Sequence, residues 1–180
     1  MLDLKVDSSW TLFLDRDGVI NQRNFEGYIT SVDDFIFLPQ AIEGLKLLSQ
    51  QFSKIIVVTN QQGIAKQIMT EQTLNEIHQH MIDTLKNEGV SIDKVYFASN
   101  LKGAENDRRK PNNAMALEAK RDFPGIDFKR SVMVGDTSSD LIFGMNLGMK
   151  TVLIQSEEKV DITPDLTVKH LNELANVFNK

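Results

Sequence analysis

The chain has 180 residues, of which 41% are hydrophobic and 25% charged, values typical of a soluble globular protein with one core. Its net charge of −5 argues against a nucleic-acid or anionic-membrane partner, and the absence of cysteine excludes disulfides and thiolate metal sites. Asp3, Lys5 and Asp7 interrupt the segment where a signal peptide would need an apolar run. We therefore expect a cytoplasmic protein with a single domain over residues 1–180, either a monomer or a small homo-oligomer.

The first predicted element is the apolar run from Trp10 to Leu14, which has no polar alternation and is typical of a strand buried on both faces. Asp15-Arg16-Asp17-Gly18 follows at once, so two carboxylates stand where a buried strand gives way to a glycine turn. Open α/β sheets bind ligands at that edge. The pair favours a hard divalent cation, with Mg²⁺ as the first candidate, although Asp beside Gly is equally typical of a surface turn.

Residues 22–34 are polar and predict a loop over the mouth of the site. Pro39 is placed to begin a helix whose apolar residues recur up to Leu48. Residues 54–59 are apolar and β-branched, which predicts a second buried strand ending at Thr59 and Asn60.

Thr70 predicts the cap of a helix running to about Glu88. His78 and His80 lie two residues apart on it and do not share a face, so we expect ordinary solvated side chains and no joint metal site. The later elements are strands at 95–98, 131–134 and 151–154 and helices beginning at Pro111 and at about Ser139. The segment from Leu166 to Val168 and a helix around Leu171 to Phe178 finish the chain. Strands alternating with helices predict an α/β fold with a doubly wound, mostly parallel sheet.

The polar residues that follow the strands are of a consistent kind. They are Asp15 and Asp17, Thr59 and Asn60, and Asp136 with Asp140, and Lys110 adds a cation from a loop. The carboxyl ends of parallel strands share one edge of a sheet, so these side chains are expected to converge.

The set suits phosphoryl transfer. Asp15 is the candidate nucleophile and Asp17 the candidate acid and base. Asp15, Asp136 and the backbone carbonyl of Asp17 are the candidate Mg²⁺ ligands. Thr59 and Lys110 are expected to bind phosphoryl oxygens. Each residue also has an ordinary structural explanation: Lys110 could belong to a solvated basic patch, and Asp140 could cap the next helix.

The chain resembles the haloacid dehalogenase superfamily of phosphatases, whose four motifs match Asp15 to Asn21, Thr59 to Gln61, Arg109 to Pro111, and Gly135-Asp136 with Asp140. The form of the first motif resembles the branch that contains histidinol-phosphate phosphatase and D-glycero-D-manno-heptose 1,7-bisphosphate phosphatase. The resemblance implies the roles given above, an aspartyl-phosphate intermediate, substrate contacts from Asn60 and Arg109, and a core without a cap domain.

Two departures from that branch affect the expectations. The positions that would hold a structural zinc are Ala98, Asn100, Asn106 and Arg108, none of which is a thiol or an imidazole, so no structural zinc is expected. Thr137 stands where heptose enzymes tend to have a lysine.

The expected partner is a small phosphorylated metabolite, with a heptose 1,7-bisphosphate as the first substrate and histidinol phosphate as the alternative. A non-catalytic module that binds phosphate on an aspartate is the rival of another class.

Overall fold

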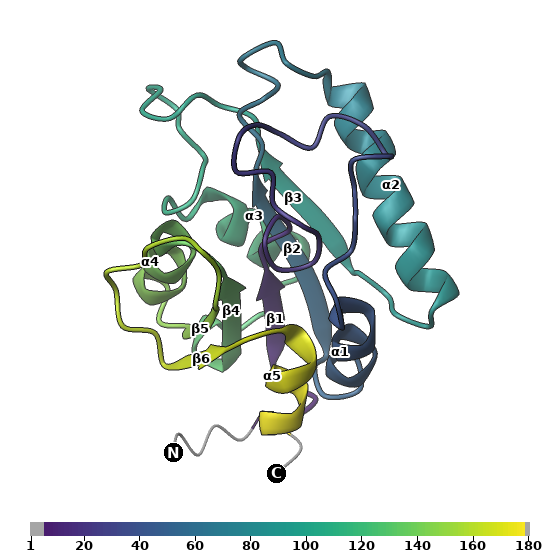
Figure 1. Cartoon of the computed structure of the whole chain (residues 1–180). Coiled ribbons are helices and arrows are strands. Elements are labelled where there is room, and N and C mark those ends of the chain that lie inside the picture. Colours follow the sequence, from purple (N-terminus) through teal and green to yellow (C-terminus); the bar gives the residue numbers. More distant parts are fainter. Residues whose placement is uncertain (1–5, 179–180) are drawn as a thin grey trace.

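Six strands form one sheet in the computed structural model, which describes residues 6–178 (Figure 1). Asp3 and Lys5 lie outside the described residues. Every pair of neighbouring strands is parallel, in the order β3-β2-β1-β4-β5-β6. The strands are β1 (Thr11–Leu14), β2 (Lys54–Asn60), β3 (Lys94–Ala98), β4 (Ser131–Gly135), β5 (Lys150–Ile154) and β6 (Leu166–Val168). The predicted doubly wound α/β fold is confirmed.

The sheet has a hydrophobic core on each face, which explains why its strands are continuously apolar. In β1, Leu12 and Leu14 point into one core and Phe13 into the other, because successive side chains of a strand alternate between faces. One core includes α1 (Ala41–Leu48), α2 (Glu71–Asn87) and α5 (Leu171–Phe178), and the other includes α3 (Ala114–Asp122) and α4 (Ser138–Asn146) (Figure 1).

Two helices begin later than their prolines predicted. Pro39 lies before α1, which starts at Ala41 after Gln40 has adopted a left-handed conformation with φ of 62°. Pro111 lies before α3, which starts at Ala114, and the residues between them form a turn. Proline fixes φ equally well for a turn, so its presence alone does not locate the first residue of a helix.

The site is positioned by the order of the strands. Strand β1 lies between β2 and β4, so the chain winds away from it in both directions. In such sheets a crevice opens beyond the carboxyl ends of the strands where the winding reverses. None of the described helices is both long and apolar enough to cross a membrane.

Candidate active site

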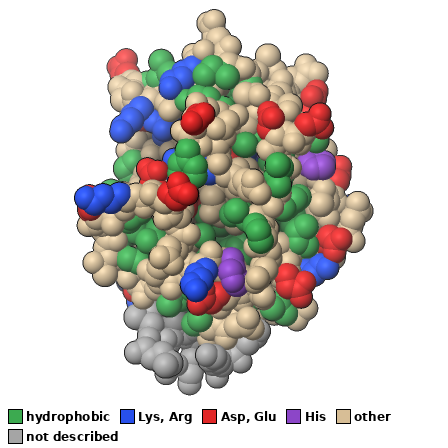
Figure 2. Space-filling view, in the orientation of Figure 1, with side chains coloured by type: hydrophobic (Ala, Val, Ile, Leu, Met, Phe, Trp, Pro, Cys, Tyr) green, Lys and Arg blue, Asp and Glu red, His purple; other side chains and the backbone are tan. Residues whose placement is uncertain are grey.

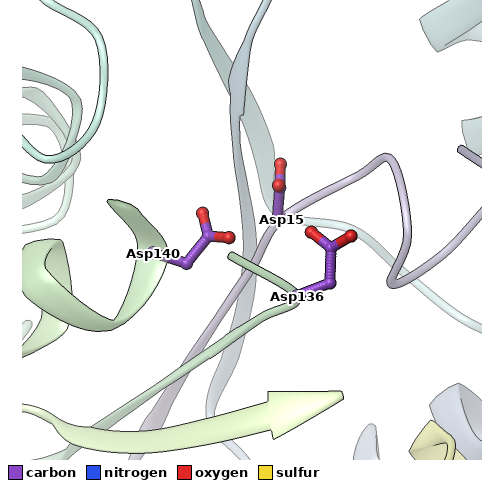
Figure 3. A group of neighbouring side chains, drawn as sticks. All are labelled: Asp15, Asp136 and Asp140. Carbon is purple, nitrogen blue, oxygen red and sulfur yellow. The ribbon is translucent and has the colours of Figure 1, made fainter. Parts of the chain in front are cut away.

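Three aspartates meet beyond the ends of β1 and β4. Asp15 follows β1, Asp136 follows β4, and Asp140 lies in the first turn of α4. One carboxylate oxygen from each lies within 4.8 Å of the others, and Figure 3 shows the three side chains directed toward one another. The structure thus brings together the acids that the sequence predicted at the ends of the first and fourth strands.

Two glycines make room for this cluster. A Cβ at Gly18 would collide with the Asp136 carboxylate, and one at Gly135 would collide with the Asp140 side chain. Gly18 also has φ of +85°, a left-handed conformation that side chains disfavour. The glycines in both sequence motifs are therefore required for the close approach of the carboxylates.

Lys110 is buried between two of the carboxylates. Its Nζ lies 2.9 Å from Asp15 Oδ1 and 2.6 Å from Asp140 Oδ1. The side-chain amide of Asn60 holds the lysine backbone in both directions: its Oδ1 accepts from Lys110 N–H at 2.8 Å, and its Nδ2 donates to the Lys110 carbonyl at 3.1 Å. Lys110 is therefore an ion-paired cation of the site, and Asn60 has a positioning part that the sequence did not predict.

Asp140 has both of the roles that its sequence position suggested: it helps to cap the following helix and it belongs to the charged cluster. Its Oδ2 accepts from the Thr137 backbone N–H at 3.0 Å and from the Thr137 hydroxyl at 2.6 Å, which caps α4. Its Oδ1 pairs with Lys110. Since both oxygens are engaged, Asp140 is better suited to holding the lysine than to binding a metal ion.

Burial and mutual repulsion perturb the acids. Burial raises the pKa of Asp15 to about 7; Lys110 opposes the rise, and the Asp140 and Asp136 carboxylates add to it. Burial and the Asp140 charge raise the pKa of Asp136 to about 6, although Arg23 opposes this. Burial disfavours the charged form of Lys110, but Asp140 and Asp15 outweigh burial and raise its pKa. The cluster is therefore short of positive charge.

The donor set fits a hard divalent cation. Asp136 Oδ1 is buried and has no hydrogen-bond partner among residues 6–178. Asp15 Oδ1 accepts from Arg16 N–H at 2.7 Å and pairs with Lys110, while no described residue donates a hydrogen bond to Oδ2. Carboxylate oxygens without donors are the ligands that Mg²⁺ prefers. Asp15 and Asp136 are thus able to share a magnesium ion.

The carboxylate of Asp17 lies in a different environment. Arg16 Nη2 donates to both of its oxygens, at 2.9 and 3.0 Å. Asn21 Nδ2 donates to Oδ1 at 2.9 Å and Gln61 Nε2 to Oδ2 at 3.0 Å. Burial would raise the pKa of Asp17, but the Arg16 charge and the hydrogen bonds hold it below its usual value. The two acids of the first motif are therefore differentiated, as two groups with separate roles require.

A cavity of about 260 Å³ opens above these groups. It is lined by the predicted residues Asp15, Asp17, Thr59, Asn60 and Arg109, and also by Arg23, Asn24, Phe25, Gly27, Tyr28, Ile29, Gln61, Gln62, Thr137 and Ser139. The lining includes the predicted loop of residues 22–34. On the face shown in Figure 2, acidic and basic side chains are interspersed. The cavity is of a size to take a small phosphorylated molecule.

His78 contradicts the sequence prediction of a solvated side chain. Only 6% of it is exposed, and its Nε2 lies 3.1 Å from Nη1 of Arg16, which is fully buried. His80 is partly buried, and its ring contacts that of Phe35 edge to face. The spacing rule correctly separated the two histidines but could not show that one of them faces a buried arginine 62 residues away.

Arg23 is a second functional candidate that the sequence did not single out. Its Nη1 lies 3.0 Å from Asp136 Oδ2, and its side chain lines the cavity. The sequence placed it in a loop expected to lie over the mouth of the site, and the family resemblance implied that the loop from Arg23 to Tyr28 takes part in substrate choice, but neither gave Arg23 a role of its own.

The loop of residues 99–109 is ordered by an aspartate. Asp107 accepts from Gly103 N–H at 3.0 Å and from Arg109 N–H at 2.9 Å. Arg108 Nη2 donates to both carboxylate oxygens of Glu118, and Arg108 does not line the cavity. These contacts connect the loop to Arg109, which does line it.

Buried carboxylates, a buried lysine and a separately hydrogen-bonded Asp17 at the carboxyl end of one parallel sheet are groups suited to phosphoryl transfer through an aspartate. This combination of fold and site defines the class as haloacid dehalogenase phosphatases.

Comparison with known proteins identifies the family. Residues 12–164 match the family described as polynucleotide kinase 3 phosphatase. The chain is 33% identical, over 94% of its length and 95% of the relative, to a D-glycero-alpha-D-manno-heptose-1,7-bisphosphate 7-phosphatase from Campylobacter jejuni. It is 30% identical, over 94% of its length and 97% of the relative, to a D-glycero-beta-D-manno-heptose-1,7-bisphosphate 7-phosphatase from Helicobacter pylori.

A solved structure shares the fold. The D,D-heptose 1,7-bisphosphate phosphatase from B. bronchiseptica, complexed with magnesium and phosphate, matches with a TM-score of 0.85 and 24% identity, over 94% of this chain and 98% of that one. The chain therefore belongs to the polynucleotide kinase 3 phosphatase family, in the heptose-bisphosphate branch of the haloacid dehalogenase phosphatases.

Proposed function

We propose that the chain is a Mg²⁺-dependent phosphatase that removes the 7-phosphate of a D-glycero-D-manno-heptose 1,7-bisphosphate through an aspartyl phosphate. The observation that carries the mechanism is the meeting of Asp15, Asp136 and Lys110 at one edge of the sheet. The substrate comes from the names of relatives at 30% and 33% identity, which cover nearly the whole chain.

Asp15 is the nucleophile of this proposal. One of its carboxylate oxygens attacks phosphorus and the other would bind the metal ion, while Arg16 N–H and Lys110 Nζ hold the carboxylate in place through Oδ1. Asp15, Asp136 and the backbone carbonyl of Asp17 would hold the magnesium ion, which, when bound, neutralises charge on the phosphoryl oxygens. Lys110 and the Thr59 hydroxyl bind those oxygens.

Asp17 carries the proton. It protonates the departing alkoxide as the aspartyl phosphate forms, and then accepts a proton from the water that cleaves it. Its low pKa in the free protein favours the ionised form, and an arriving phosphate dianion would raise that pKa through like-charge repulsion. Asp17 is thus suited to both half-reactions once substrate is bound.

The cavity offers cations for a second phosphate. Arg109 lines it, with a buried Nε that has no hydrogen-bond partner among the described residues, and Arg23 lines it too. Guanidinium groups suit this task because they bind phosphate in two-pronged fashion. Arg108, its neighbour in the sequence, pairs instead with Glu118 and does not line the cavity. Two free or exchangeable guanidinium groups favour a bisphosphate over histidinol phosphate.

The test is turnover of both anomers of heptose 1,7-bisphosphate and of histidinol phosphate with Mg²⁺. We expect kcat/KM for a heptose bisphosphate to exceed that for histidinol phosphate by at least about 100-fold, the worth of two charge-assisted contacts. A preference for histidinol phosphate would overturn the substrate. Asp15→Asn should abolish turnover, and wild-type rates in that variant would overturn the covalent mechanism. Absence of turnover of every phosphate ester by the unmodified protein would favour the non-catalytic binding module.

The site chemistry also predicts no structural zinc, since Ala98, Asn100, Asn106 and Arg108 offer no zinc ligand. Elemental analysis after chelation and repurification is the measurement, and one equivalent of zinc would contradict the prediction. We place this activity in the cytoplasm, where small phosphorylated metabolites are turned over.

A further inference from the structure

Arg16, between the two acids of the first motif, is the largest fully buried side chain of the described residues. A buried guanidinium is strongly unfavourable unless it is paired and hydrogen-bonded. Its partners therefore decide where it lies. One partner is its neighbour Asp17, and another is His78 on α2, 62 residues further along the chain.

The guanidinium has three contacts with fixed geometry. Nη2 donates to both oxygens of Asp17, and Nε is 3.3 Å from Oδ1. Nη1 lies 3.1 Å from His78 Nε2. The guanidinium carbon lies 5.8 Å from the centre of the Phe35 ring, within the range of a cation–π contact. The plane and the direction of the guanidinium are thereby both determined.

The contact with His78 fixes the state of the imidazole. Arginine has only donors, so Nε2 of His78 must accept, and the ring proton must lie on Nδ1. Burial first, and then the Arg16 charge, lower the pKa of His78 to about 3, so the ring is neutral at physiological pH. A neutral imidazole can act here as a permanent hydrogen-bond acceptor.

We propose that His78 is a positioning residue: by accepting from Arg16 Nη1 it fixes the guanidinium, which in turn fixes the Asp17 carboxylate for proton transfer. The inference rests on the proposed role of Asp17 as acid and base. Without an acceptor, Nη1 would be a buried donor with no partner, which is unfavourable, and the guanidinium would turn to find another acceptor. A displacement of about 1 Å at a catalytic group can cost on the order of 100-fold in rate.

The test compares leaving groups. The leaving group of 4-nitrophenyl phosphate departs without a proton, whereas that of glycerol 2-phosphate needs one. We expect His78→Leu to lower kcat/KM for glycerol 2-phosphate at least about 10-fold more than for 4-nitrophenyl phosphate, because a misplaced Asp17 would lose part of the rate enhancement that general acid catalysis provides. His78→Gln, whose amide can replace the Nε2 acceptor, should keep the wild-type ratio. Gln79→Ala, at an exposed neighbour on α2, is the matched control.

Equal losses for both substrates in His78→Leu, or no loss for either, would overturn the proposal. If that variant does not fold, His78→Asn takes its place, because its shorter amide cannot reach the Nε2 position. A wild-type ratio in His78→Asn would then overturn the proposal. Asp17→Asn distinguishes the role of Asp17 from that of His78. If Asp17→Asn lowers kcat/KM equally for both substrates, the proposed role of Asp17 is wrong. If Asp17→Asn affects glycerol 2-phosphate more and the His78 variants do not, only the positioning role of His78 is wrong.

Discussion

His78 should contribute to the dependence of the protein's stability on pH, and His78→Gln should remove that contribution. A histidine in the unfolded chain has a pKa of about 6.5. Burial and the neighbouring Arg16 charge lower the pKa of His78 in the folded protein to about 3. Between these values the unfolded chain binds a proton that the folded protein excludes. The contribution of His78 is therefore fully present above about pH 6.5 and is lost progressively as the pH falls.

The size of the effect follows from the two pKa values. Between pH 7 and pH 5, protonation of the unfolded histidine lowers the free energy of unfolding by about 2 kcal/mol. Glutamine does not titrate, so the wild type should lose about 2 kcal/mol more than His78→Gln over this interval. If the wild type is more stable than His78→Gln at pH 7, the difference between their free energies of unfolding should be about 2 kcal/mol smaller at pH 5.

Urea unfolding at several pH values measures this difference. The single tryptophan, Trp10, provides the fluorescence signal. Asp15 and Asp136 also have raised pKa values, but both are present in the wild type and in the variant, so their contributions cancel in the comparison. A chelator should be present throughout, because a bound cation would add its own pH dependence.

Parallel pH dependences in the wild type and in His78→Gln would refute the reasoning. They would mean that His78 is protonated equally easily in the folded and unfolded states, which is incompatible with an imidazole that accepts from a buried guanidinium. His80→Gln is the matched control, since His80 lies on the same helix and is less buried.

Gly135→Ala should lower kcat/KM at least about 100-fold, because its methyl group would displace Asp140, whereas Gly125→Ala, at an open position, should leave kinetics unchanged. Lys110→Met should lower kcat on the order of 100-fold or more by removing the buried cation, and an unchanged kcat would contradict its phosphate-binding role. Asp107→Ala should raise KM about 5-fold with kcat nearly unchanged, since it frees the loop that carries Arg109; steady-state kinetics that show the reverse split would contradict this.

The sheet could be predicted because its physical cause lies in short segments of sequence. Residues 12–14 are apolar without alternation because the two faces of β1 meet two different cores. The ends of the strands could be predicted for the same reason, since the apolar run stops where Asp15 or Asp136 begins. The start of α1 could not, because it depends on a left-handed conformation at Gln40 that no local residue preference demands.

The candidate site was predictable only in part. Asp15 and Asp136 follow strands, and the geometry of a parallel sheet brings such residues together. The environment of His78 depends instead on which face of α2 meets Arg16, a contact between residues far apart in sequence. Helical periodicity gives the faces of a helix but not what each face meets. Sequence analysis therefore missed residues whose role is to position another functional group.

The charges of the site explain why a cation and a phosphate should bind together. Three buried carboxylates, Asp15, Asp136 and Asp140, face two cations, Lys110 and Arg23, so one negative charge is unbalanced. A phosphate dianion approaching this cluster alone would be repelled. A bound divalent cation changes the net charge of these groups from one negative to one positive, and a phosphate dianion that binds next makes it one negative again. The raised pKa values of Asp15 and Asp136 express the same imbalance, because each carboxyl group can also relieve it by taking a proton.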